Sequence, residues 1–121
     1  MVKALFDTNI LIDYLNGIDK AKAALNRFED KGISIITWME VMIGTTAENN
    51  IDTKFFLSGF EIIAIDESVA EQAVKLRKSK RIKLPDAIVW GSAIVHHRIL
   101  VTRDAKGFAQ DEIGIQIPYS L

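Results

Sequence analysis

Short apolar segments alternate with amphipathic segments along most of this 121-residue chain. The apolar segments are rich in isoleucine and valine and lack a strict alternation of apolar and polar residues, which is typical of buried parallel strands. They predict five strands, at Lys3–Phe6, Ile33–Ile36, Glu61–Ile65, Ile99–Thr102 and Ile115–Ile117.

Between the predicted strands, apolar residues recur at three- and four-residue spacing, which predicts helices. Gly17 ends the first helix, Asp66 is a good N-cap for a later one, and Pro85 suits the first turn of the last. The predicted helices cover Asn9–Leu15, Lys20–Lys31 (with Gly32 past its end), Lys54–Leu57, Glu67–Lys80 and a segment from Pro85 through Ile94. Strands that alternate with helices predict an α/β fold, with a parallel sheet covered on both faces. The length fits one domain, residues 1–121.

Four acidic residues lie where such a sheet would bring them together. Asp7 and Asp104 follow predicted strands, Glu40 lies at the head of a further helix-like stretch that begins at Thr37, and Asp86 stands at the start of the last predicted helix. Ligands of parallel sheets bind outside the carboxyl ends of the strands. Two like charges about 4 Å apart cost roughly 4 kcal/mol at an effective dielectric constant of about 20, so this cluster needs protons or a cation. With no cysteine and two histidines, the chain favours an oxygen-seeking cation, Mg²⁺ or Mn²⁺, and metal-dependent phosphate chemistry.

Each acid also has a structural explanation. Asp7 can cap the helix that follows it, and Thr37 with Glu40 has the spacing of a capping box. Asp86 can offset a helix dipole, and Asp104 is a common turn residue. The convergence of all four on one sheet edge favours the functional interpretation. Other acids, Asp13 among them, are expected to be solvated surface residues or caps.

The charge distribution adds a second feature. A net charge of −1 argues against a protein that holds nucleic acid by its overall field. However, residues 75–83 carry six positive charges, and the rest of the chain has nine basic and sixteen acidic residues. This basic strip could grip phosphates beside an acidic centre, or simply offset the dipole at the end of a helix. The strip consists of Lys75, Arg77, Lys78, Lys80, Arg81 and Lys83.

No export signal and no apolar stretch long enough for a membrane span is visible in the sequence. The absence of cysteine fits a reducing compartment. We therefore expect a cytoplasmic protein without a membrane partner.

The order of the acidic motifs resembles the PIN-domain nucleases. The motifs are Asp7-Thr8-Asn9, then Glu40 within Thr-Trp-Met-Glu-Val-Met-Ile-Gly, then Leu84-Pro85-Asp86-Ala87, then Thr102-Arg103-Asp104. The short length and the Glu-x-x-x-Gly and Leu-Pro-Asp-Ala patterns look most like the VapC toxins of toxin–antitoxin pairs. The resemblance runs from Val2 to about Phe108. No single motif is specific, whereas all four in this order are.

The resemblance implies a three-layer α/β/α sandwich with a central parallel sheet of four or five strands. It also implies a homodimer, Mg²⁺- or Mn²⁺-dependent cleavage of RNA, and a cognate antitoxin whose tail enters the acidic cleft. Many relatives carry a further aspartate where this chain has Gly107, which leaves one or two ions possible.

The mechanism that we expect from this resemblance is metal-assisted hydrolysis of a phosphodiester. Asp7 and Asp86 would hold the primary ion, while Glu40 and Asp104 would hold waters or a second ion. Candidate substrate-binding residues are Thr8, Asn9, Thr102 and Arg103, of which the first three would also orient the acids.

Three alternatives belong to other classes. A phosphatase of the haloacid-dehalogenase type would have Asp-x-Asp after its first strand, but Asn9 replaces the second acid here. A signalling receiver domain would need a paired aspartate near the start and a late lysine after a strand, and neither is convincing. A catalytically inactive PIN-like module that only binds a protein would not need all four acids.

Overall fold

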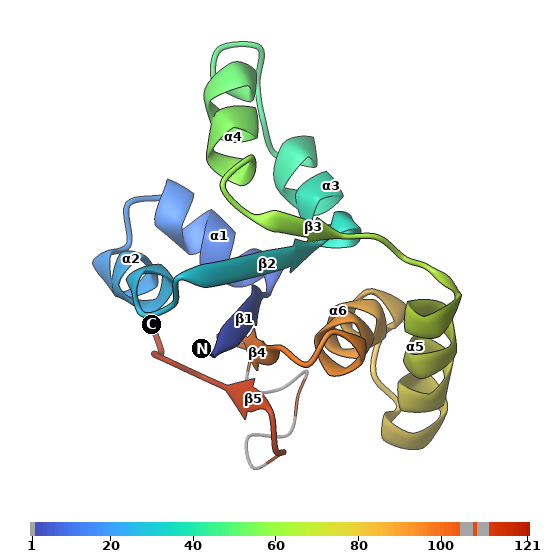
Figure 1. The fold of residues 1–121 in the computed structure, drawn as a ribbon. Coiled ribbons are helices and arrows are strands. Elements are labelled where there is room, and N and C mark those ends of the chain that lie inside the picture. Colours follow the sequence, from blue (N-terminus) through green and yellow to red (C-terminus); the bar gives the residue numbers. More distant parts are fainter. Residues whose placement is uncertain (1, 105–107, 109–111) are drawn as a thin grey trace.

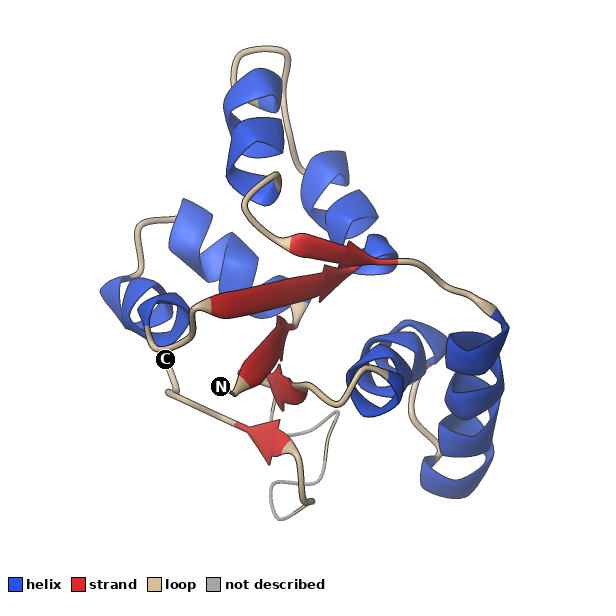
Figure 2. Ribbon diagram, in the orientation of Figure 1, coloured by secondary structure: helices blue, strands red, loops and turns tan. Residues whose placement is uncertain are grey.

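The protein is described by a computed structural model that covers residues 2–104, 108 and 112–121. Five strands and six helices alternate along these residues (Figures 1 and 2). The strands are β1 (Lys3–Phe6), β2 (Asp30–Ser34), β3 (Glu61–Ile63), β4 (Ile99–Val101) and β5 (Ile115–Gln116). The helices are α1 (Thr8–Leu15), α2 (Asp19–Asn26), α3 (Ile35–Ile43), α4 (Asn50–Leu57), α5 (Glu67–Lys80) and α6 (Leu84–Val95).

All neighbouring strands are parallel, in the order β3-β2-β1-β4-β5. Strand β1 lies at the centre, with Leu5 opposite Gly32 of β2 and Leu100 of β4. The carboxyl ends of these strands therefore meet at one edge of the sheet. The predicted α/β class and parallel sheet are confirmed.

Helices cover both faces of the sheet (Figure 2). Ala4 and Phe6 of β1 belong to a core packed under α1–α4, whereas Leu5 belongs to a second core under α5 and α6. This division follows from the alternation of side chains along a strand. Helices α5 and α6 approach closely at Gly91, where an added Cβ would lie 3.2 Å from the Ala73 backbone nitrogen. The lack of a side chain at Gly91 thus lets the two helices pack closely.

The second strand ends earlier than its apolar pattern predicted. Strand β2 stops at Ser34, whose side chain accepts a hydrogen bond from the Ile36 amide (3.2 Å) and caps α3. The apolar run 33–36 spans the end of the strand and the first helical turn, so hydropathy alone could not divide it. Thr37 lies inside α3 rather than at its start, and the capping-box alternative for Glu40 is therefore wrong.

The second predicted helix was too long. Helix α2 ends at Asn26, and Phe28 packs against the core. Asp30 and Lys31 pair with β1, so Gly32 lies within β2 rather than past a helix end. The fourth helix begins at Asn50, earlier than predicted. At the end of α2, sheet pairing and core contacts outweighed the local pattern. Among the described residues, no helix is both long and apolar enough to cross a membrane.

Candidate active site

Asp7 lies between the central strand and the first helix. Its Oδ1 accepts a hydrogen bond from the Thr8 amide (2.8 Å), as expected of an N-cap. Its Oδ2 accepts from Thr102 Oγ1 (2.8 Å) and from Asn9 Nδ2 (3.3 Å). Only 6% of Asp7 is exposed. Asp7 is therefore a cap, but its second oxygen is oriented by residues that a cap does not need.

The pKa of Asp7 is raised to about 6, chiefly by burial and also by the nearby carboxylates of Asp86 and Glu40. Hydrogen bonds from Thr102 and Thr8 act in the opposite direction. Burial dominates because a charged carboxylate loses its hydration in this position. A cation that replaced the lost hydration would favour the ionised form.

Glu40 lies in the second turn of α3 and reaches the start of α1. Thr8 Oγ1 donates a hydrogen bond to Glu40 Oε1 (2.6 Å) and lies 3.1 Å from Thr37 Oγ1. The Glu40 residue itself is exposed, whereas Thr37 is fully buried. The two threonines thus fix a carboxylate that still faces solvent.

Asp86 lies in the first turn of α6. Burial raises the pKa of Asp86, and the carboxylates of Asp104 and Glu40 add to the shift, while Lys83 lowers it. The Asp104 amide donates to Thr102 Oγ1 (3.1 Å), the hydroxyl that also binds Asp7. Because their charges act on one another, Asp7, Glu40, Asp86 and Asp104 form one electrostatic group at the carboxyl edge.

The acids are gathered but not packed into a closed cage. Within the described residues, no three His, Cys, Asp or Glu side chains are close enough to hold one ion by themselves. Mg²⁺ keeps several waters and needs only one or two direct carboxylates. An all-oxygen donor set with raised pKa values at Asp7 and Asp86 fits such a hydrated, hard cation.

The chain matches the PIN domain over residues 4–112. It belongs to the PIN domain family. A chain in a toxin–antitoxin complex from Klebsiella pneumoniae is 45% identical, with a TM-score of 0.94 over 98% of this chain and 100% of that one. The family assignment confirms the resemblance and excludes the phosphatase alternative. Among proteins of curated function, none matches this chain.

More distant structures share the fold alone. FitAcB from Neisseria gonorrhoeae is 23% identical, with a TM-score of 0.80 over 95% of this chain and 97% of that chain. VapBC2 from Rickettsia felis, solved with a DNA fragment from the promoter, is 24% identical. Its TM-score is 0.79 over 100% of this chain and 99% of that chain.

One buried residue of this PIN domain escaped the sequence analysis. Asp13 is 5% exposed and receives hydrogen bonds from Arg103 Nε (2.6 Å), Arg103 Nη2 (3.2 Å) and the Tyr119 hydroxyl (2.7 Å). The expectation of a solvated or capping Asp13 is therefore wrong. Its position three residues after the buried Ile10 was the signal, because that spacing places both on one helix face.

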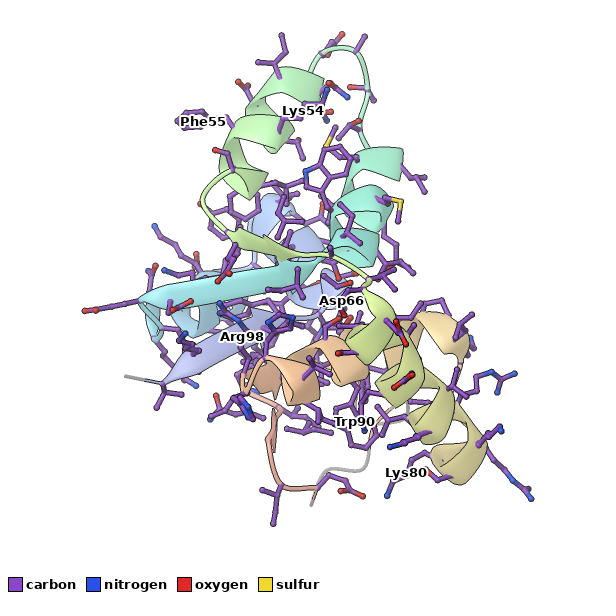
Figure 3. All side chains as sticks on the ribbon, turned by 45° about the vertical axis from the view of Figure 1, so that its right-hand side comes forward. Lys54, Phe55, Asp66, Lys80, Trp90 and Arg98 are labelled. Carbon is purple, nitrogen blue, oxygen red and sulfur yellow. The ribbon has the colours of Figure 1, made fainter. Side chains whose placement is uncertain are left out.

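The basic strip is partly engaged in the structure of the PIN domain. Lys80 pairs with Glu112 (2.7 Å) and lies 6.0 Å from the centre of the Trp90 ring (Figure 3). Arg77 donates to the Ile82 carbonyl (3.1 Å). Lys83 is the member that acts electrostatically on Asp86. Residues of the strip therefore form contacts at the end of α5, and the strip also extends to the acidic group through Lys83. Gly107, the departure from the family pattern, lies outside the described residues.

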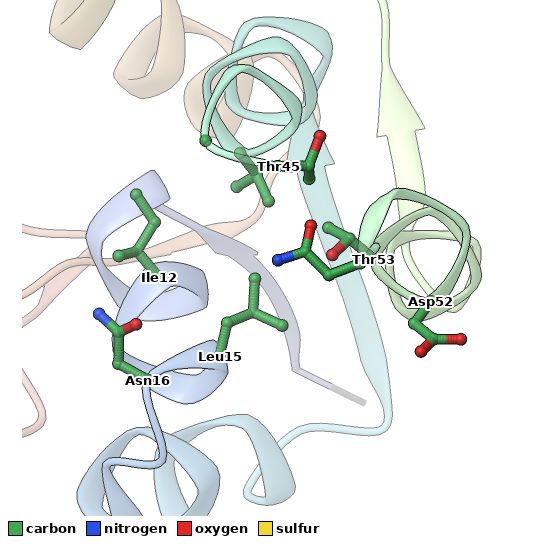
Figure 4. Close-up of a pocket in the computed structure, with 9 residues that line it drawn as sticks. Ile12, Leu15, Asn16, Thr45, Asp52 and Thr53 are labelled. Atoms are coloured by element: carbon green, nitrogen blue, oxygen red, sulfur yellow. The ribbon is translucent and has the colours of Figure 1, made fainter. Parts of the chain in front are cut away.

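A groove of about 360 Å³ opens elsewhere, between α1, α3 and α4 (Figure 4). Its walls include Ile12 and Leu15 of α1, Val41 of α3, and Thr53 of α4. None of the four acids lines it. The groove is thus separate from the acidic group.

Proposed function

We propose that this PIN domain is a metal-dependent endoribonuclease of the VapC type, the toxin of a toxin–antitoxin pair. One observation carries the proposal: carboxylates from four separate segments share the carboxyl edge of the sheet. Within the described residues, no lysine or arginine forms an ion pair with Asp7, Glu40 or Asp86. The family assignment and the toxin–antitoxin complex from Klebsiella support the same function.

Asp7 and Asp86 are the residues that would hold Mg²⁺ or Mn²⁺, and Glu40 and Asp104 would hold its waters or a second ion. When bound, the ion supplies a water of lowered pKa and offsets charge on the leaving oxygen of the phosphodiester. The residues beside these acids would then orient them or attract the substrate.

Thr102 and Asn9 orient the inner oxygen of Asp7. Thr8 orients Glu40, whose position facing solvent suits a group that holds a water. Lys83, beside Asp86, is placed to attract an RNA phosphate toward the acids.

The proposal includes a protein partner. Three apolar side chains on α3 and α4 are largely exposed: Ile43 by 83%, Ile51 by 79% and Phe55 by 81%. They lie on two of the helices that line the groove, and Figure 3 shows Phe55 pointing away from α4. Exposed apolar surface of this kind marks protein interfaces. We assign it to a cognate antitoxin, whose tail would then reach the acids.

A paired test is co-expression with the antitoxin of the Klebsiella relative, using Phe55→Ser. Loss of co-purification is expected from this change and not from Ser58→Ala on the same helix. Retained binding by Phe55→Ser would move the partner surface elsewhere. A homodimer, expected from the family, is tested by light scattering of the purified protein.

The function itself is tested by incubating purified protein with total RNA and Mn²⁺. Discrete fragments are expected from the wild type, with none after chelation. Asp7→Asn and Asp86→Asn should leave RNA intact while remaining folded. Calorimetric titration with Mg²⁺ or Mn²⁺ distinguishes the nuclease from a catalytically inactive binding module, because the inactive module should give no heat of binding.

A further inference from the structure

Asp13 connects three segments that are far apart in sequence. It lies on α1, Arg103 follows β4, and Tyr119 belongs to the segment after β5. Its Oδ2 accepts from both Arg103 Nε and the Tyr119 hydroxyl, and its Oδ1 accepts from Arg103 Nη2. Such a two-pronged pair with arginine fixes the plane of the guanidinium as well as its position.

Arg103 stands between two residues of the acidic group. Thr102 before it donates to Asp7, and Asp104 after it acts on Asp86. The Arg103 amide donates to Asn9 Oδ1 (3.1 Å), while its side chain binds Asp13. Asn9 and Asp13 are four residues apart on one face of α1. The segment 102–104 is thus held against α1 at two successive turns.

We propose that Asp13 is a positioning residue of the metal site. By holding the Arg103 guanidinium, it fixes the segment 102–104 and hence the relative positions of Asp7 and Asp104. Tyr119 completes the set of donors to the buried carboxylate. This proposal deepens the proposed function, because it assigns a support to the same site.

The alternative role for Arg103 is direct contact with RNA phosphate. Two of its N–H groups already donate to Asp13, and that buried carboxylate offsets its charge. A guanidinium paired in this way is better suited to fixing the position of its segment than to attracting a phosphate. The two roles make different predictions for variants that keep the charge.

The test compares Asp13→Asn with Asp30→Asn, since Asp30 also pairs with an arginine, Arg98 (2.8 Å), at the amino edge of the sheet. Calorimetry measures the Mn²⁺ dissociation constant of each full-length variant, and thermal unfolding measures its stability. Positioning predicts Mn²⁺ binding about tenfold weaker in Asp13→Asn, the lower end of effects seen for groups that support metal ligands. Asp30→Asn should lose stability and keep its Mn²⁺ affinity within about twofold.

Arg103→Lys covers the case in which Asp13→Asn does not fold. Lysine keeps the charge but cannot form the two-pronged pair. Positioning predicts weaker Mn²⁺ binding and a lower kcat in Arg103→Lys, with KM for a short RNA unchanged. The double variant, Asp13→Asn with Arg103→Lys, should bind Mn²⁺ no more weakly than the more affected of the two single variants. The reason is that both substitutions remove the same interaction. A raised KM with unchanged Mn²⁺ affinity would instead assign Arg103 to RNA and overturn the proposal.

A measurement on the metal-free protein tests the role of Asp13 independently of the proposed function. In the metal-free protein, hydrogen exchange at the Arg103 and Asp104 amides should be about tenfold faster in Asp13→Asn than in Asp30→Asn. Equal exchange in the two variants overturns the positioning role. If the wild type binds no Mn²⁺, the proposed function fails, while the exchange result still decides what Asp13 does.

Discussion

The two ends of the parallel strands carry similar acidic residues in opposite electrostatic situations. At the amino ends, Asp30 of β2 and Glu61 of β3 both bind Arg98, the residue before β4. At the carboxyl ends, Asp7 and Asp86 have raised pKa values and neighbour further carboxylates. One edge contains its own cation, and the proposed function gives the other edge a metal ion.

The amino edge is built around a buried arginine (Figure 3). The Arg98 side chain is 2% exposed and also donates to the Ala4 carbonyl (3.0 Å). Gly32 makes room for it, because an added Cβ would lie 3.0 Å from the guanidinium carbon. Arg98 thus pairs with two carboxylates and also donates to a backbone carbonyl, so Asp30 and Glu61 help to stabilise the sheet. Position at a strand end therefore does not by itself make an acid a functional candidate, and Asp7 and Asp86 differ from Asp30 and Glu61 in their raised pKa values and acidic neighbours.

The largest effect is expected at the carboxyl edge. Asp86→Asn should lower RNA cleavage by about 100-fold or more, because a direct ligand of the ion is lost. The melting temperature should not fall, since Asp86 is destabilised by its neighbours in the metal-free protein. Cleavage rates under single-turnover conditions measure this effect, with Asp30→Asn as the control at the other edge. A folded Asp86→Asn protein with normal cleavage would remove Asp86 from the site.

The next largest effect is expected at the amino edge. Arg98→Ala leaves Asp30 and Glu61 without their shared cation and should lower the free energy of unfolding by about 3 kcal/mol. The two carboxylates are partly exposed, which limits the loss to the lower end of values for buried pairs. Urea unfolding measures the change. Cleavage per folded molecule should be unchanged, and a selective loss of cleavage would show that the edges are coupled.

Asp7 gives the carboxyl edge a pH dependence. Its folded pKa of about 6 lies above the ordinary value of 3.8, so the folded state binds the proton more tightly. The contribution of Asp7 to the stability of the metal-free protein should therefore be fully present below about pH 4 and be lost as the pH rises to about 6, a change of roughly 3 kcal/mol. Asp7→Asn should remove this fall and stabilise the metal-free protein at neutral pH by about 1–3 kcal/mol.

Thermal unfolding in the presence of a chelator, at acid and neutral pH, measures both proteins. The stabilisation expected from Asp7→Asn is smaller than the pH-dependent loss in the wild type. An asparagine amide nitrogen in the place of Oδ2 cannot accept the hydrogen bond from Thr102. An identical pH dependence in wild type and Asp7→Asn would contradict a protonated Asp7.

The smallest effect tests the space beside Arg98. Gly32→Ala should cost about 1–2 kcal/mol, since the guanidinium is held by hydrogen bonds and cannot move freely. Gly44→Ala is the matched control, because its added Cβ would meet only the Val41 carbonyl at 3.5 Å. Denaturant unfolding compares the two. Equal stabilities would show that Arg98 has room to shift.

The sequence by itself determined the features that depend on neighbouring residues. The apolar run before Asp7, the Asp66 cap of α5 (2.9 Å to the Val69 amide) and Pro85 in the first turn of α6 are local signals. They predicted strand β1 and the starts of α5 and α6. The boundary at Ser34 was missed, because one apolar run served both a strand and a helix.

Only the tertiary structure decided which charges are compensated. Asp13 meets Arg103 across 90 positions and Tyr119 across 106, and Arg98 meets Ala4 across 94. The helical spacing places Asp13 on the same face as Ile10, but no local pattern identifies Arg103 and Tyr119 as its partners. Pairing depends on which segments the sheet order brings together, and burial then makes that pairing decisive, since an unpaired charge is costly where water is excluded.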